Sequence, residues 1–103
     1  MVTYNFTKLK DMVSRVDKEE LYIIICKNIK KFRVQRYNEF KAQNLQNTIN
    51  PFSSENIAEL LDYNHNHYKR FESENDSTRI IPLEKIVKLS IILDKSIDDF
   101  IRK

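Results

Sequence analysis

The sequence predicts an all-α fold. Its 103 residues contain no glycine and only two prolines, so little interrupts a helical backbone. Apolar residues recur at intervals of three and four instead of alternating, which is the periodicity of amphipathic helices. With 41% hydrophobic and 32% charged residues, the composition is typical of one globular domain. We expect an N-terminal helical extension, residues 1–20, followed by a single unit, residues 21–103.

The first half holds a short helix and a long one. Residues 7–16 are predicted to form the short helix, because four apolar side chains lie at i, i+3, i+4 and i+7: Leu9, Met12, Val13 and Val16. Asp17, with Glu20 three residues later, is typical of a capping box that opens the next helix. This long helix extends to about Ala42. Its apolar stripe consists of Leu21, Ile24, Ile25, Ile29 and Phe32.

Two short helices joined by a tight turn come next. Ser53 is the expected N-cap of the first. That helix carries three apolar side chains at helical spacing: Ile57, Leu60 and Leu61. Asp62 stands where the chain must turn, and Asn64 is a favourable N-cap for a helix over residues 65–72.

Residues 65–72 form the most informative segment of the chain. Tyr68 and Phe71, at i and i+3, are expected to be buried. The opposite face carries amide groups and positive charge and no acid: His65, Asn66, Lys69 and Arg70. A helix with this distribution fits a DNA major groove.

The C-terminal part is predicted to be helical after a polar loop from Ser73 to Thr78. Pro82 suits the first turn of a helix. The apolar stripe that follows consists of Leu83, Ile86, Val87, Leu89, Ser90 and Leu93. Ser96 is the expected cap of a last turn. Three side chains of that turn can fold back on the core: Ile97, Phe100 and Ile101.

The order of these helices resembles the Cro/C1-type (XRE) family of helix-turn-helix transcriptional regulators. The resemblance covers roughly residues 25–101 and depends on three segments: Lys30-Lys31-Phe32-Arg33, the ungapped helix pair 53–72 with Ala58 at the helix crossing, and Pro82 to Phe100. It implies a compact five-helix bundle. This chain departs from the family in its extra N-terminal helix, in Asp62 where glycine is usual, and in an extended connection between Arg33 and Ser53.

The resemblance, together with the outer face of residues 65–72, implies a set of DNA contacts. Base contacts are expected from His65, Asn66 and Arg70, because an amide suits an adenine edge and a guanidinium suits a guanine edge. Phosphate contacts are expected from Ser53, Ser54, His67 and Lys69. The family also pairs its first helix with the end of the recognition helix. At the matching positions here, Arg33 and Glu72 should form a structural ion pair.

Several classes of function lack support in the sequence. Without glycine there is no phosphate-cradling loop, and no nucleophile or paired-carboxylate arrangement stands out, so we expect neither an enzyme nor a cofactor. His65 and His67 point about 200° apart on a helix, which serves one metal ion poorly. Cys26 lies beside an apolar stripe and is expected to be a packed hydrophobic residue. The chain lacks a bilayer-length apolar run and a signal peptide, so we expect a cytoplasmic protein and no membrane partner.

The function expected is sequence-specific binding of double-stranded DNA by a transcriptional regulator, a repressor acting as a homodimer. The alternative is a protein-interaction module of the same fold, antitoxin-like or regulator-binding, with little DNA binding. The helix at 7–16 and the side chains of Tyr37, Phe40 and Leu45 are excess apolar surface for a five-helix core. They either pack on the edge of the core or form a dimer interface that sets two recognition helices about 34 Å apart.

Overall fold

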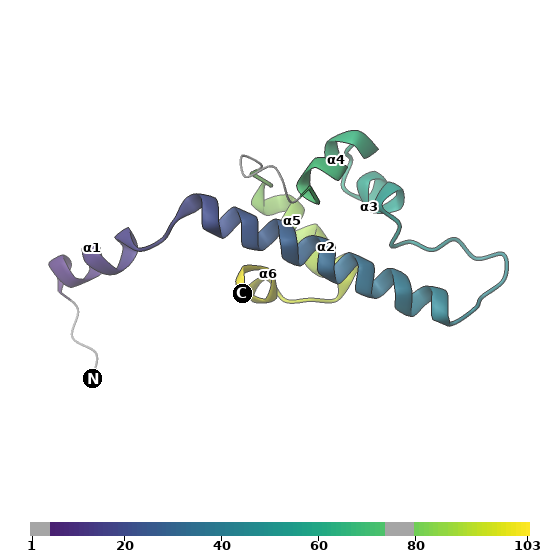
Figure 1. Cartoon of the computed structure of the whole chain (residues 1–103), viewed down its shortest axis with the longest axis horizontal. Coiled ribbons are helices and arrows are strands. Elements are labelled where there is room, and N and C mark those ends of the chain that lie inside the picture. The colour runs from purple at the N-terminus through teal and green to yellow at the C-terminus, as the bar shows by residue number, and fades with distance from the viewer. Residues whose placement is uncertain (1–4, 74–79) are drawn as a thin grey trace.

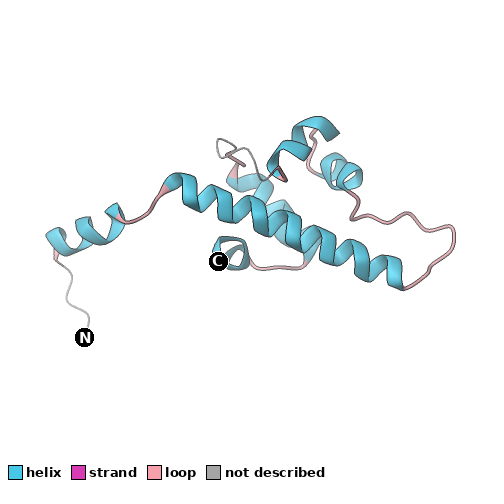
Figure 2. Cartoon of the chain, in the orientation of Figure 1, coloured by secondary structure: helices cyan, strands magenta, loops and turns pink. Residues whose placement is uncertain are grey.

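The computed structural model describes residues 5–73 and 80–103, which form six helices and no strand (Figure 1; Figure 2). The helices are α1 (Phe6–Ser14), α2 (Lys18–Ala42), α3 (Ser54–Leu60), α4 (His65–Phe71), α5 (Leu83–Leu93) and α6 (Ile97–Ile101). The predicted all-α class is therefore confirmed. Most of the polar loop predicted from Ser73 to Thr78 lies outside the described residues.

The long helix α2 organises the bundle. In Figure 1, α3 and α4 lie above α2, α6 lies below it, and α5 crosses behind it. One side of α2 buries Ile25, Ile29 and Phe32, and the Phe32 ring meets the Phe100 ring of α6 edge-on at 5.3 Å between centroids. Cys26 is buried in the same core, as expected. α2 therefore supplies the common surface on which the other helices pack.

The predicted helix starts agree with the structure because their caps form locally. Four predicted N-cap side chains accept a hydrogen bond from a first-turn backbone amide: Asp17, Ser53, Asn64 and Ser96. Only Ser96 belongs to a complete capping box. The expected box at Asp17 is half formed, because the Glu20 carboxylate pairs with Lys103 at 2.6 Å. Pro82 is the N-cap of α5, one position before the first turn.

Polar side chains of α2 bind the carboxyl ends of two other helices. Asn28 is buried, and its Nδ2 donates to the carbonyls of Phe100 at 2.8 Å and Arg102 at 2.7 Å. Arg36 donates from Nε to the Leu93 carbonyl at 2.8 Å. The last carbonyls of a helix have no partner within it, so these donors satisfy groups that α5 and α6 leave free.

Replacing Asn28 should loosen α6. Asn28→Ala is expected to lower the free energy of unfolding by about 1–2 kcal/mol, because buried carbonyls lose their donor. Urea unfolding followed by circular dichroism measures this. Asn38→Ala is the matched control, since Asn38 is exposed on the same helix. Equal stability of the two variants would show that the Asn28 hydrogen bonds contribute nothing.

Several apolar side chains expected in the core are exposed. Leu60 is 51% exposed, although its neighbours Ile57 and Leu61 are fully buried. The same correction applies to four residues of α5 and α6: Leu83, Val87, Ile97 and Ile101. These helices are short and touch the bundle along one narrow line. Only the side chains on that line are buried, including the Leu89, Leu93 and Phe100 side chains.

The extended connection between α2 and α3 is held by Asn50. Its side-chain Nδ2 donates to the Tyr37 backbone carbonyl at 3.1 Å, and its side-chain Oδ1 accepts from the Phe52 backbone amide at 3.0 Å. Its backbone carbonyl accepts from the side-chain Nδ2 of Asn56. Tyr37 and Phe40 are half-buried, with the Phe40 ring edge-on to Phe52, whereas Leu45 is exposed. Two of the three excess apolar side chains therefore pack within the chain.

Helix α1 stands apart from the bundle and buries none of its residues (Figure 1). It begins one residue before the predicted start and ends two residues before the predicted end. All four predicted apolar side chains, Leu9, Met12, Val13 and Val16, are exposed. Neither α1 nor any other helix of the described residues is long and apolar enough to cross a membrane.

Candidate nucleic-acid interface

The turn between α3 and α4 is closed without glycine. Asp62 adopts a left-handed conformation, with φ of 59°, and the Tyr63 amide donates to the Ala58 carbonyl at 2.9 Å. Lys85 of α5 donates to the Leu61 carbonyl at 2.6 Å, and its ammonium lies over the Tyr63 ring. Ala58, at the crossing of the two helices, is buried as expected. Lys85 is a residue that the sequence analysis missed.

The conformation of Asp62 makes a prediction about stability. Left-handed backbone disfavours residues with a Cβ and disfavours β-branched ones most. Asp62→Gly should leave the free energy of unfolding unchanged or raise it by up to about 1 kcal/mol, whereas Asp62→Val should lower it by about 1–2 kcal/mol. Thermal unfolding of the two variants measures the difference. A valine variant as stable as the glycine variant would contradict it.

Three predicted contact residues lie on the exposed face of α4. Asn66, Lys69 and Arg70 are exposed on the side of the helix opposite the buried Tyr68 and Phe71. We call these three residues the α4 outer face. The short helix is held by its buried side and by the Asn64 cap, whose side chain accepts from the His67 amide at 2.7 Å. The outer face therefore presents an amide and two cations from a fixed backbone.

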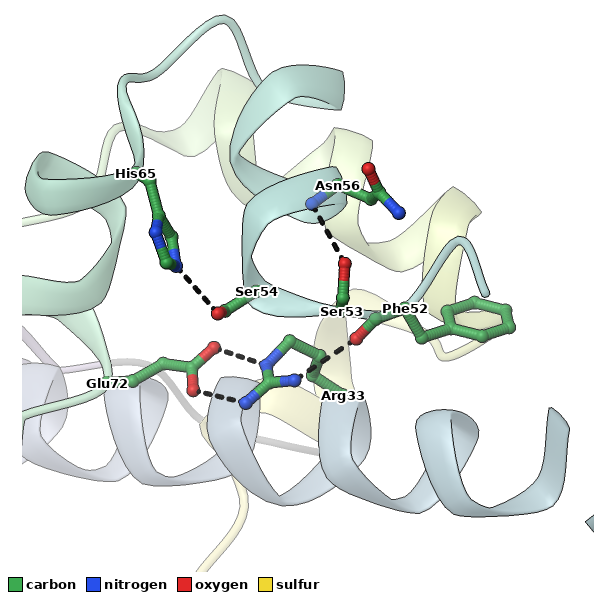
Figure 3. A network of polar contacts seen from close by, with 7 residues as sticks. All are labelled: Arg33, Phe52, Ser53, Ser54, Asn56, His65 and Glu72. Carbon is green, nitrogen blue, oxygen red and sulfur yellow. Dashed lines mark hydrogen bonds and ion pairs between the residues drawn. The ribbon is translucent and has the colours of Figure 1, made fainter. Parts of the chain in front are cut away.

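The two histidines lie at opposite edges of this face. His65 is half-buried, and its Nε2 lies 2.8 Å from the Ser54 hydroxyl (Figure 3). His67 is exposed, but its ring packs on Tyr63 and Phe71, with centroid distances of 4.6 and 5.5 Å. His65 therefore joins the starts of α3 and α4, and His67 covers an aromatic cluster. Both side chains have a structural role besides the DNA contacts expected of them.

The serines at the start of α3 also have partners within the chain. The Ser53 hydroxyl accepts from the Asn56 amide at 3.2 Å, and the Ser54 hydroxyl meets His65 (Figure 3). Both side chains are half-buried. Each hydroxyl uses one of its three hydrogen-bonding positions in these contacts, because a hydroxyl donates once and accepts twice.

Arg33 and Glu72 form the expected ion pair with two hydrogen bonds. The Arg33 Nε and Nη2 lie 2.6 and 2.8 Å from the two Glu72 carboxylate oxygens, and Nη1 donates to the Phe52 carbonyl at 3.1 Å (Figure 3). The side chains are only 14% and 10% exposed. The pair thus connects α2 to the end of α4 and to the segment before α3, and it fixes the position of α4.

Burial and charge both act on this pair. Burial disfavours the charged guanidinium, but the hydrogen bond and negative charge of Glu72 outweigh burial and raise the pKa of Arg33. The Tyr68 phenol lies next to both groups. Burial, and then the charge of Glu72, raise the pKa of Tyr68. Tyr68 therefore stays neutral and Arg33 stays charged throughout the pH range in which the protein can be studied.

Acidic and basic side chains on the surface are separated between α3 and α4. Three acids line the outer surface of α3 and the turn, where they are exposed: Glu55, Glu59 and Asp62. α4 carries only cations. A polyanion approaching this region is therefore attracted by α4 and repelled by the outer surface of α3.

Comparison with known proteins adds no assignment. No family model, curated protein or solved structure matches this chain. Within residues 5–73 and 80–103, no three His, Cys, Asp or Glu side chains gather in a way that could hold a metal ion.

Proposed function

We propose that the protein is a sequence-specific DNA-binding transcriptional regulator of the XRE type, a repressor, which inserts α4 into the major groove. The observation that carries this proposal is the α4 outer face. Asn66, Lys69 and Arg70 are exposed together on a helix whose other side is buried and whose end is held by the Arg33–Glu72 pair. Donors fixed on a helix that protrudes from a bundle can reach base edges in the major groove.

Each residue of the interface has a proposed role. Asn66 suits an adenine edge and Arg70 a guanine edge, each through two hydrogen bonds. Lys69 contacts phosphate, with His67, Ser53 and Ser54 as further phosphate contacts. His65 is the third base contact. Whether its ring donates a hydrogen bond to a base or accepts one depends on its tautomer, and the same tautomer decides the direction of its hydrogen bond with Ser54. A cytoplasmic location is part of the same proposal.

A specific observation favours the alternative, an antitoxin-like or regulator-binding protein-interaction module. Glu59, one of the acids on the outer surface of α3, lines an apolar groove of about 360 Å³ together with Ile49, Pro51 and Leu60. Exposed apolar side chains with charge at their rim are typical of protein-binding surfaces. This surface is formed by α3 and the segment before it.

Binding to random-sequence duplex DNA at several salt concentrations separates the two functions. If α4 contacts DNA, the logarithm of the binding constant should fall linearly with the logarithm of the salt concentration, because phosphate contacts release counterions. Lys69→Ala should lower the slope by about one. Lys18→Ala, at the start of α2, is the control and should leave the slope unchanged. Failure to bind duplex DNA at low salt would favour the protein-interaction module.

A further inference from the structure

The apolar side of α1 is exposed along its whole length. Five side chains, here called the α1 stripe, face solvent: Phe6, Leu9, Met12, Val13 and Val16. Lys8 and Lys10 border the stripe on its two sides, as the 100° step per residue requires. An isolated nine-residue helix is marginal in water, so its stability requires a surface against which the stripe can pack.

A groove begins three residues beyond the end of α1. It has a volume of about 610 Å³ and lies between the first turns of α2 and the segment after α6. Ile23 and Ile24 supply its apolar lining. Charged side chains of both signs surround them, with three acids and three cations: Asp17, Glu19, Glu20, Lys27, Arg102 and Lys103. Glu20 pairs with Lys103, whereas Glu19 has no ion-pair partner among the described residues. We call this feature the α2 groove.

We propose that α1 of one copy occupies the α2 groove of a second copy, and that the exchange is reciprocal. The stripe would cover the exposed isoleucine, and a lysine at its border would face Glu19. Because the groove carries three acids and three cations, the fit depends on the apolar contact and on this one ion pair. Because each copy gives and receives the same helix, the assembly is a closed dimer with two-fold symmetry. This proposal does not depend on DNA binding by α4.

The short hinge explains why the occupant is a second copy. Only Arg15, Val16 and Asp17 separate the two helices. Asp17 is extended and caps α2 through the Glu20 amide at 3.0 Å, and α1 points away from the bundle (Figure 1). To reach its own groove, α1 would have to reverse direction within these three residues, one of which, Val16, belongs to the stripe. Short hinges of this kind favour exchange between copies.

Sedimentation equilibrium of paired variants tests the helix and the groove separately. Val13→Asp places a charge in the stripe, and Thr7→Asp places the same charge on the opposite side of α1. Ile23→Asp alters the groove, and Val34→Asp alters an equally exposed position, 37%, elsewhere on α2. We expect a dimer for the parent and both controls. The stripe and groove variants should raise the dimer dissociation constant at least about tenfold, with unchanged helix content by circular dichroism.

Hinge length provides an independent variant. Inserting a flexible run of glycine and serine between Val16 and Asp17 should let α1 fold back onto its own groove and yield a folded monomer. A monomeric parent protein would overturn the proposal. So would an Ile23→Asp variant that remains as dimeric as Val34→Asp, because α1 would then bind elsewhere. Neither result bears on the proposed function of α4, which is tested by the salt dependence of DNA binding in the Lys69→Ala variant.

Discussion

Replacing Arg33 by methionine is expected to lower the free energy of unfolding by about 3–5 kcal/mol. The substitution would leave the Glu72 carboxylate buried without its partner, and a stranded buried charge costs more than the pair contributes. Glu72→Met should cost a similar amount for the same reason. The positions of α4 and of the segment before α3 both depend on this pair, so DNA affinity should fall with stability. Urea unfolding measures the first effect.

The chain offers a matched control in a surface ion pair. Arg15, which follows α1, has its Nη2 atom 2.7 Å from the Oδ2 atom of Asp11 in α1, but the two side chains are 74% and 63% exposed. Arg15→Met should cost less than about 1 kcal/mol, because water replaces the lost contact. The double variant Arg33→Met/Glu72→Met should recover most of the loss, since no charge is stranded. An Arg33→Met variant no less stable than Arg15→Met would contradict the structural role of the pair.

Changes in the α4 outer face should alter DNA specificity more than stability. Asn66→Ala and Arg70→Ala are each expected to weaken binding to the preferred site by about 1–3 kcal/mol and to weaken binding to random DNA less, because base contacts carry the specificity. Fluorescence anisotropy with labelled duplexes measures both affinities. The side chains are exposed, so the unfolding midpoint should not move.

Lys69→Ala is the control for this prediction. A phosphate contact does not distinguish sequences, so its loss should weaken binding to both duplexes about equally. If Asn66→Ala and Arg70→Ala leave the affinity for the preferred site intact in a folded protein, α4 is not the helix that reads the sequence.

Much of the helical architecture could be predicted because its determinants are local. Each of the caps at Asp17, Ser53, Asn64 and Ser96 is formed by a side chain and an amide three residues later, so a short stretch of sequence contains both partners. The burial of Tyr68 and Phe71 follows in the same way from helical periodicity. The Arg33–Glu72 contact was expected from the family resemblance and not from local sequence.

The remaining features depend on partners far apart in the chain. Asn28 binds carbonyls more than 70 residues away, and Lys85 binds one 24 residues away. Nothing near these side chains in the sequence indicates a buried acceptor. Leu60 shares the helical spacing of its buried neighbours but is exposed. Periodicity gives the direction of a side chain, but it does not give the width of the contact between helices. The His65–Ser54 contact brings together two residues that were assigned separate DNA contacts.

Selection of bound sequences from a random pool of duplex DNA tests the central claim most directly. The experiment compares the parent protein with the double variant Asn66→Ala/Arg70→Ala. If α4 reads bases in the major groove, the parent should enrich a short motif, and the variant should lose the preference at the positions that these two side chains contact. Enrichment of no motif by the parent, or of the same motif by both proteins, would contradict the claim that α4 is the recognition helix.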